Sequence, residues 1–179
     1  MPAAGMSEIV QSAQAAGRGI GAFNVIGIEH AEAIVAGAEA AASPVVLQIS
    51  ENCAAYHGAL EPIARACLSI AGSVDVPVAV HLDHATREDL VHAAAGLGVQ
   101  SVMYDASALS YARNVEATAG VAQWCHEHGI WVEAELGEIG GKTACIRRWP
   151  APGRTRRRPT SRRPGWTRWR SRSAARTRC

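Results

Sequence analysis

The sequence predicts an α/β fold, with about five consecutive β/α units of a (β/α)8 barrel in residues 1–142. Apolar runs of strand length alternate with amphipathic stretches of helix length, which is the pattern of a parallel sheet covered by helices. Such a sheet is buried on both faces, so polar side chains are expected only where its strands end.

The predicted elements follow one another without a long gap. Residues 6–16 form the leading helix, and a second helix over residues 28–42 carries Ile34, Val35 and Ala38 on one face before Ser43-Pro44 ends it. The next run, residues 45–50, is apolar almost throughout, as a buried strand requires. The strands are expected at 20–25, 45–50, 77–82, 99–104 and 130–136, and the later helices at 60–71, 87–95 and 111–128.

The polar residues at the strand ends favour a barrel over an open, doubly wound sheet. They are Asn24, Ser50, Asp83, Asp105 and Glu135, each from a different strand. A barrel collects such residues around one mouth, whereas an open sheet concentrates its site at one switch point. The first strand is also not followed by Gly-x-Gly-x-x-Gly, which argues against a dinucleotide-binding fold.

The charge of the chain changes abruptly near residue 146. Residues 1–146 hold all 16 acidic residues and five basic ones, a net charge of −11, whereas residues 147–179 hold 13 arginines and no acid. We expect residues 143–179 to be a disordered tail, because their apolar surface is too small to offset the entropy of ordering.

Two explanations of this tail compete. A basic segment with tryptophans is suited to RNA, since arginine contacts phosphate and aromatic rings stack on bases. However, residues 147–179 contain no lysine, and their residue types are those that GC-rich codons encode. We favour translation in a wrong reading frame, so nucleic acid is not expected as a partner.

The cysteines and the apolar runs indicate a cytoplasmic protein. The five cysteines are odd in number and form no Cys-x-x-Cys pair, which predicts neither a disulfide framework nor a structural zinc site. The N-terminus has no signal-peptide pattern, and no apolar run reaches the length of a membrane span, so no membrane interaction is expected.

The segment His81-Leu82-Asp83-His84 ends a buried strand in three ionisable side chains. Such groups are costly away from water unless they face a cleft. On a strand His81 and Asp83 share a face, and His84, already turning, can reach a ligand at the strand end. A carboxylate beside an imidazole suits a metal ligand next to a general acid or base, although two histidines that cap a loop are the alternative.

A second acidic motif, Glu133-x-Glu135, comes at the end of the fifth strand. Both acids face the same side, and like charges on one strand are costly unless a cation, a proton or a basic partner lies between them. Because residues 1–146 have few basic residues, a divalent metal is one reasonable partner. Solvated acids at a strand end are the alternative.

Together these motifs closely resemble the class II, zinc-dependent fructose-bisphosphate or tagatose-bisphosphate aldolases. The resemblance rests on residues 81–85, on the strand that ends at Asp105 and on residues 133–141, and it extends to residues 21–25 and 48–50. It implies a (β/α)8 TIM barrel, dimeric or larger, that cleaves a ketose bisphosphate into dihydroxyacetone phosphate and an aldehyde. The expected partners are a sugar bisphosphate and further copies of the same chain.

The resemblance also implies roles for single residues. His84 would bind the catalytic zinc, Zn2+, and Asp83 would exchange the proton of the substrate's C4 hydroxyl. Asp105 and Glu135 match positions that hold a second divalent metal, or the same zinc in an alternative place. Zinc would act as a Lewis acid on the ketone oxygens, which removes the need for a lysine Schiff base.

The resemblance gives the other matched residues substrate-binding or structural roles. Asn24 and Ser50 would line the substrate pocket. His81, Glu133 and Glu138 match structural positions rather than ligands.

The chain departs from the family after Gly141. The family takes two more zinc histidines and its phosphate-binding loops from later strands, and residues 142–179 offer neither. We therefore expect an aldolase fragment that is inactive by itself. The alternatives are another metal-dependent TIM-barrel lyase or hydrolase, and an RNA-binding protein that uses the arginine-rich tail.

Overall fold

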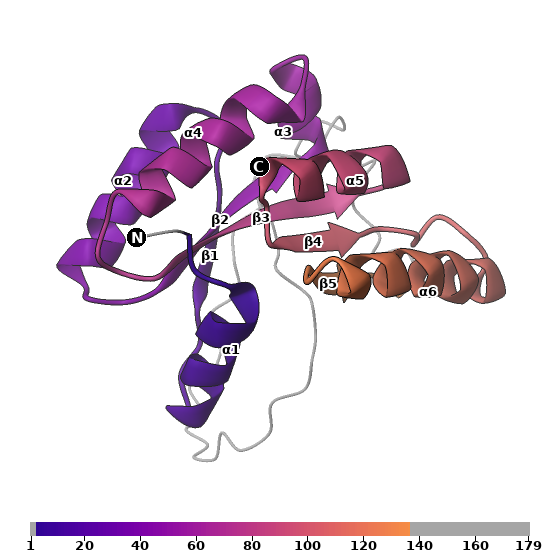
Figure 1. Cartoon of the computed structure of the whole chain (residues 1–179), viewed down its shortest axis with the longest axis horizontal. Coiled ribbons are helices and arrows are strands. Elements are labelled where there is room, and N and C mark those ends of the chain that lie inside the picture. Colours follow the sequence, from indigo (N-terminus) through magenta and orange to yellow (C-terminus); the bar gives the residue numbers. More distant parts are fainter. Residues whose placement is uncertain (1–2, 137–179) are drawn as a thin grey trace, which may run out of the picture. The chain divides into compact units, whose positions relative to one another are not determined.

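A five-stranded parallel sheet forms the core of residues 3–136, the part of the chain that the computed structural model describes (Figure 1). Its spatial order, β1-β2-β3-β4-β5, is the order of the sequence, without the reversal that defines a doubly wound sheet. This confirms the predicted barrel order. The strands are β1 (Gly21–Asn24), β2 (Val45–Ser50), β3 (Val78–Ala85), β4 (Ser101–Tyr104) and β5 (Trp131–Ala134).

Six helices accompany the sheet in the described part of the chain, and five of them were predicted. The exception is α3, a short helix that Ser50 caps by accepting a hydrogen bond from the Cys53 amide at 3.1 Å. Six residues are too few to show a helical period, so the sequence pattern did not reveal it. The helices are α1 (Met6–Ala15), α2 (Ile28–Ala40), α3 (Glu51–Tyr56), α4 (Leu60–Gly72), α5 (Glu88–Leu97) and α6 (Tyr111–Glu127).

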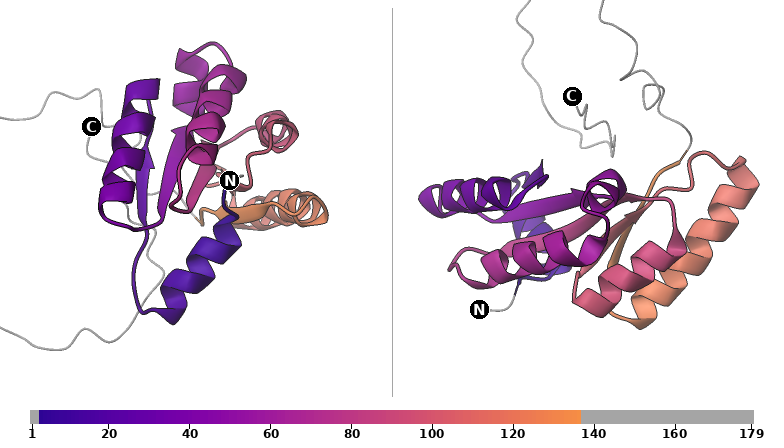
Figure 2. Two further views of the ribbon diagram at one scale, coloured as in Figure 1. Left: turned by 60° about the vertical axis from the view of Figure 1, so that its left-hand side comes forward. Right: turned by 90° about the horizontal axis from the view of Figure 1, so that it is seen from above.

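The two faces of the sheet have different covers. The helices that follow the strands lie along one face of the sheet (Figure 2). The larger apolar cluster, which includes Val45 and Leu47, packs these helices against the sheet. On the opposite face Val46 packs with Met6 and Ile9 of α1. Successive strand residues point to opposite faces, so α1 covers the side that becomes the interior of a barrel.

The third strand is longer than predicted, and the prediction that it ends at Leu82 was wrong. β3 runs to Ala85, and its register against β4 shifts between Leu82 and Ala85. His84 lies in this irregular stretch with φ of 51°, a left-handed conformation that is uncommon for residues other than glycine. The extra residue is absorbed by the bulge, and the pairing resumes where Ala85 meets Tyr104.

Three of the five cysteines lie within the described residues. Cys53, Cys67 and Cys125 are buried free thiols. Cys145, Cys179 and the domain boundary at residue 142 lie outside the described residues. Within residues 3–136, no helix combines the length and apolar character needed to cross a bilayer.

Candidate metal centre

Three side chains from three neighbouring strand ends meet at one point. His84 Nδ1 lies 3.1 Å from Asp105 Oδ2 and 3.3 Å from Glu135 Oε2. One ligand atom from each of the three residues lies within 4.8 Å of the others. Asp105 and Glu135 are 8% and 4% exposed, whereas the His84 side chain is 39% exposed. We call this group, His84, Asp105 and Glu135, the triad.

The bulge in β3 brings the imidazole of His84 to the triad. In a regular strand Asp83 and His84 would point to opposite faces of the sheet. Here His84 Nε2 lies 4.0 Å from Asp83 Oδ1, so the two side chains share one side. The left-handed backbone at His84 therefore places a second ionisable side chain of β3, beside Asp83, at the strand ends.

Asp105 is fixed by the turn that follows β4. Its Oδ1 accepts hydrogen bonds from the Ser107 amide at 3.1 Å and the Ser107 hydroxyl at 2.5 Å. The Asp105 amide donates to the Ala85 carbonyl at 2.8 Å, which ties the ends of β3 and β4 together. Aspartate side chains commonly accept a hydrogen bond from the backbone amide two residues later, so the sequence contained an unused signal for the contact with Ser107.

Glu135 is held by a buried residue of α6. Asn114 Nδ2 donates to the Glu135 carbonyl at 3.0 Å, and Thr118 Oγ1 donates to Asn114 Oδ1 at 3.2 Å. Asn114 is a lone polar residue on the buried side of a helix, and the sequence offered no reason to connect it with the fifth strand.

The loop after β3 is anchored by the first residue of α3. Glu51, the first residue of α3, accepts hydrogen bonds from the Thr86 amide and hydroxyl, the shorter at 2.6 Å. Thr86 lies two residues after His84, so this contact supports the strand end that carries the triad histidine. Sequence reasoning missed Glu51 because the contact spans 35 residues of the chain.

The donor set of the triad fits a divalent metal. Two buried carboxylates beside one partly exposed imidazole concentrate negative charge, which is unfavourable without a cation or a proton. Imidazole nitrogen and carboxylate oxygen are both zinc ligands, and three protein ligands with one open position are usual in catalytic zinc sites.

Asp83 lies beside the triad, between two histidines. Its Oδ1 is 3.9 Å from His81 Nε2 and 4.0 Å from His84 Nε2. Burial lowers the pKa of His81 to about 4, with a smaller contribution from His84, so this ring is neutral at pH 7. Desolvation of the Glu133 carboxyl and, next, the charge of Asp83 raise the pKa of Glu133, although that residue as a whole is exposed on β5.

The two residues predicted to contact substrate lie on neighbouring strands. Ser50 pairs in register with Asp83, and its hydroxyl caps α3. Asn24 pairs with Gln48 at the exposed end of β1. Ser50 is therefore adjacent to the strand position of Asp83, whereas Asn24 lies two strands away from β3.

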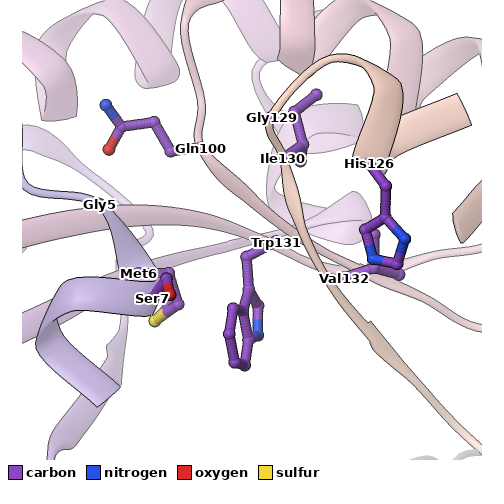
Figure 3. Close-up of a pocket in the computed structure, with 9 residues that line it drawn as sticks. All are labelled: Gly5, Met6, Ser7, Gln100, His126, Gly129, Ile130, Trp131 and Val132. Atoms are coloured by element: carbon purple, nitrogen blue, oxygen red, sulfur yellow. The ribbon is translucent and has the colours of Figure 1, made fainter. Parts of the chain in front are cut away.

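A cavity of about 480 Å3 lies elsewhere in the molecule (Figure 3). Its lining includes Ser7 of α1, Gln100 just before β4 and Trp131 at the start of β5. These residues mark the amino ends of the strands, whereas the triad lies at the carboxyl ends. Catalytic residues of (β/α)8 barrels come from the carboxyl ends, so we place the functional site at the triad and not at this cavity.

A parallel sheet in barrel order, with a histidine and two carboxylates at the carboxyl ends of adjacent strands, defines a protein of the metal-dependent (β/α)8 class. Residues 4–157 match the family described as "Fructose-bisphosphate aldolase class-II". The chain belongs to this family, whose members are in general zinc-dependent.

Individual relatives agree with this assignment. The chain is 38% identical over 144 residues to a probable fructose-bisphosphate aldolase of Bacillus subtilis, which covers 79% of this chain and 50% of the relative. It is 41% identical over 134 residues to the fructose-bisphosphate aldolase of Thermus caldophilus, covering 75% and 43%. The chain thus spans about half the length of the curated relatives it matches.

Solved structures show the same fold. The crystal structure of the YdjI aldolase from Escherichia coli K12 superposes with a TM-score of 0.71 at 31% identity, covering 75% of this chain and 52% of that one. A putative fructose-1,6-bisphosphate aldolase from Coccidioides immitis also gives 0.71, at 29% identity, covering 76% and 47%. The described sheet therefore corresponds to about half of an aldolase barrel.

Proposed function

We propose that this chain is the amino-terminal part of a zinc-dependent aldolase that cleaves a ketose 1,6-bisphosphate into dihydroxyacetone phosphate and an aldehyde. The observation that carries the proposal is the triad beside Asp83, at the carboxyl ends of a sheet in barrel order. The names of the relatives support fructose bisphosphate as the substrate class.

In this proposal some of the described residues bind the metal and another transfers the proton. His84, Asp105 and Glu135 hold Zn2+, and a zinc ion in such a site supplies Lewis-acid stabilisation of negative charge on the ketone oxygens. Asp83, adjacent to His84, accepts the proton of the substrate's C4 hydroxyl in cleavage and returns it in condensation. Ser50 and Asn24 contact the substrate from β2 and β1.

We also propose that the 179-residue chain does not turn over substrate. It spans about half of its curated relatives, and the class II resemblance places two zinc histidines and the phosphate-binding loops in the other half. Residues 143–179 are, in this proposal, an out-of-frame tail with no nucleic-acid partner. The complete protein would act in the cytoplasm as a homo-oligomer.

Zinc calorimetry on the full chain, paired with cleavage assays, tests this function. We expect zinc binding that depends on the triad, and no cleavage of fructose or tagatose bisphosphate above background. A version with the reading frame restored after Gly141 should cleave one of these substrates and lose activity in a chelator. Activity of the restored enzyme that survives a strong chelator would refute the zinc assignment.

A further inference from the structure

His81 is buried deep in the sheet, and the proposed function gives it no part. It is 1% exposed and lies in β3, two residues before Asp83. The strand register places it in one row with Gln48 on β2 and Ser101 on β4. This row lies one step below the residues that form the site, on the face that becomes the barrel interior.

The two ring nitrogens of His81 have different surroundings. Nδ1 lies 2.6 Å from the hydroxyl oxygen of Ser101, which is fully buried. Nε2 makes no hydrogen bond with any of the described residues, and its nearest charged group is Asp83 Oδ1 at 3.9 Å. A buried polar atom without a hydrogen bond destabilises the folded state, so a role for this nitrogen is expected.

Electrostatics selects one tautomer of the neutral ring. A neutral imidazole has one N–H donor and one bare nitrogen acceptor. A bare Nε2 would direct its lone pair at a carboxylate, whereas a protonated Nε2 directs an N–H dipole at it. The hydroxyl of Ser101 can donate to a bare Nδ1, so both contacts favour the proton on Nε2.

We propose that His81 is a positioning residue: Ser101 donates to Nδ1, the ring carries its proton on Nε2, and that N–H orients the carboxylate of Asp83. This role rests on the proposed function, in which Asp83 moves the substrate proton. The separation of 3.9 Å is longer than a hydrogen bond, and catalytic contacts of this kind often tighten only when substrate is bound.

Other groups around Asp83 act in different ways. His84 Nε2 approaches the same oxygen at 4.0 Å, and it belongs to a ring whose Nδ1 faces the triad carboxylates. Glu133 adds a negative group from β5. His81 differs from these two described side chains because it is buried and its Nδ1 contacts Ser101. That contact fixes the direction in which the Nε2–H of His81 points.

Nitrogen NMR of the full 179-residue chain, with 15N-labelled histidine, tests the tautomer. The His81 signal is assigned by its absence in His81→Gln. We expect a protonated Nε2 and an unprotonated Nδ1. A ring with its proton on Nδ1, an equal mixture of tautomers, or a chain too disordered to hold the ring in one state would overturn the proposal.

Substitutions then test whether Asp83 and Ser101 set this tautomer. Asp83→Asn and Ser101→Ala should each increase the population with the proton on Nδ1. Asp105→Asn is the matched control, because it removes a carboxylate of the same site that lies against His84 and Ser107. A His81 ring that shifts equally in all three variants, or in none, would contradict the specific contact.

Activity and zinc binding separate this proposal from the function on which it rests. In the frame-restored enzyme, His81→Leu should lower kcat about 100-fold with little change in KM, the cost of a misplaced catalytic group. His81→Gln keeps an N–H donor near the position of Nε2 and should recover most of that loss. Equal kcat values for the two variants would refute positioning, whereas failure of wild-type zinc binding in the same preparations would refute the proposed metal site instead.

Discussion

The middle and the margins of the sheet differ in how fully they are covered. β3 and β4 are buried along almost their whole length, and β2 nearly so. By contrast, β1 and β5 each pair with one described neighbour and are largely exposed, with Phe23 of β1 at 51%. A strand edge with unpaired backbone groups is a place where another strand binds.

This difference shows which parts of an aldolase barrel the described residues contain. The proton-transfer candidate Asp83 and the triad histidine lie on the well-covered β3. Glu135 follows the exposed edge strand β5. The triad therefore combines residues from the buried central strands with a residue from the exposed margin of the sheet. We therefore expect activity to depend most on what completes the margins, and local stability to depend most on the middle.

Completing the barrel should have the largest effect. We expect the 179-residue chain to show no aldol cleavage above background and the frame-restored chain to be active. Within the restored enzyme, Asp83→Ala should lower kcat by about 10^2 to 10^4, the usual contribution of a general acid or base. Glu61→Gln, on the exposed ion pair with Arg65 of α4, is the control and should leave kcat unchanged. Turnover by the 179-residue chain alone would show that the exposed edge strands need no further strands for activity.

Zinc binding should be the next largest effect. We expect the 179-residue chain to bind zinc weakly. Loss of a residue that only orients a metal ligand typically lowers metal affinity by about 10- to 100-fold, and His84→Ala should lower zinc affinity by more than that. His92→Ala is the matched control, because that ring packs against Trp124 on the helical surface. Calorimetry decides the outcome, and tight binding that persists in His84→Ala would mean that other residues form the site.

Acid should destabilise the covered middle through His81. Its pKa is lowered from 6.5 to about 4 on folding, so between these values the unfolded chain binds a proton that the folded chain does not. The free energy of unfolding should therefore fall as the pH drops through this window, by up to about 3 kcal/mol. Above the window both states are neutral, and the effect vanishes.

Urea unfolding of wild type and His81→Gln, at neutral pH and near pH 4, measures the contribution of His81 to the free energy of unfolding. The raised pKa of Glu133 acts in the opposite direction, because the folded state then holds a proton more tightly than the unfolded state. The difference between the two proteins removes that contribution. An identical acid dependence in both would show that His81 is not the group responsible.

The exposed margin should govern solubility with little change in stability. Open edges predict poor solubility or chaperone dependence for this chain, with binding of dyes that report apolar surface. Phe23→Lys should raise the soluble fraction while changing the free energy of unfolding by less than about 0.5 kcal/mol. Val115→Lys replaces a similarly exposed apolar residue on α6 and should not do so. A monodisperse wild-type chain without dye binding would contradict the premise.

The order of strands and helices, and the strand ends that carry the candidate site, could be predicted from the sequence. Periodicity is a local property, and the alternation of apolar runs and amphipathic helices predicted every strand and all helices except α3. The polar residue at the end of each strand could be located because parallel strands place their carboxyl ends together. The motif around His84, Asp105 and Glu135 was also readable, since its members are adjacent to those ends.

How these residues face one another depends on contacts between segments that are far apart in the sequence. The bulge that turns His84 toward the triad depends on the register between β3 and β4, which no local pattern encodes. The contacts of Ser101 with His81 and of Asn114 with Glu135 join residues that are 20 and 21 positions apart. Such contacts arise from packing between distant segments, so the site's side chains could be named from the sequence, but the groups that orient them could be found only in the folded chain.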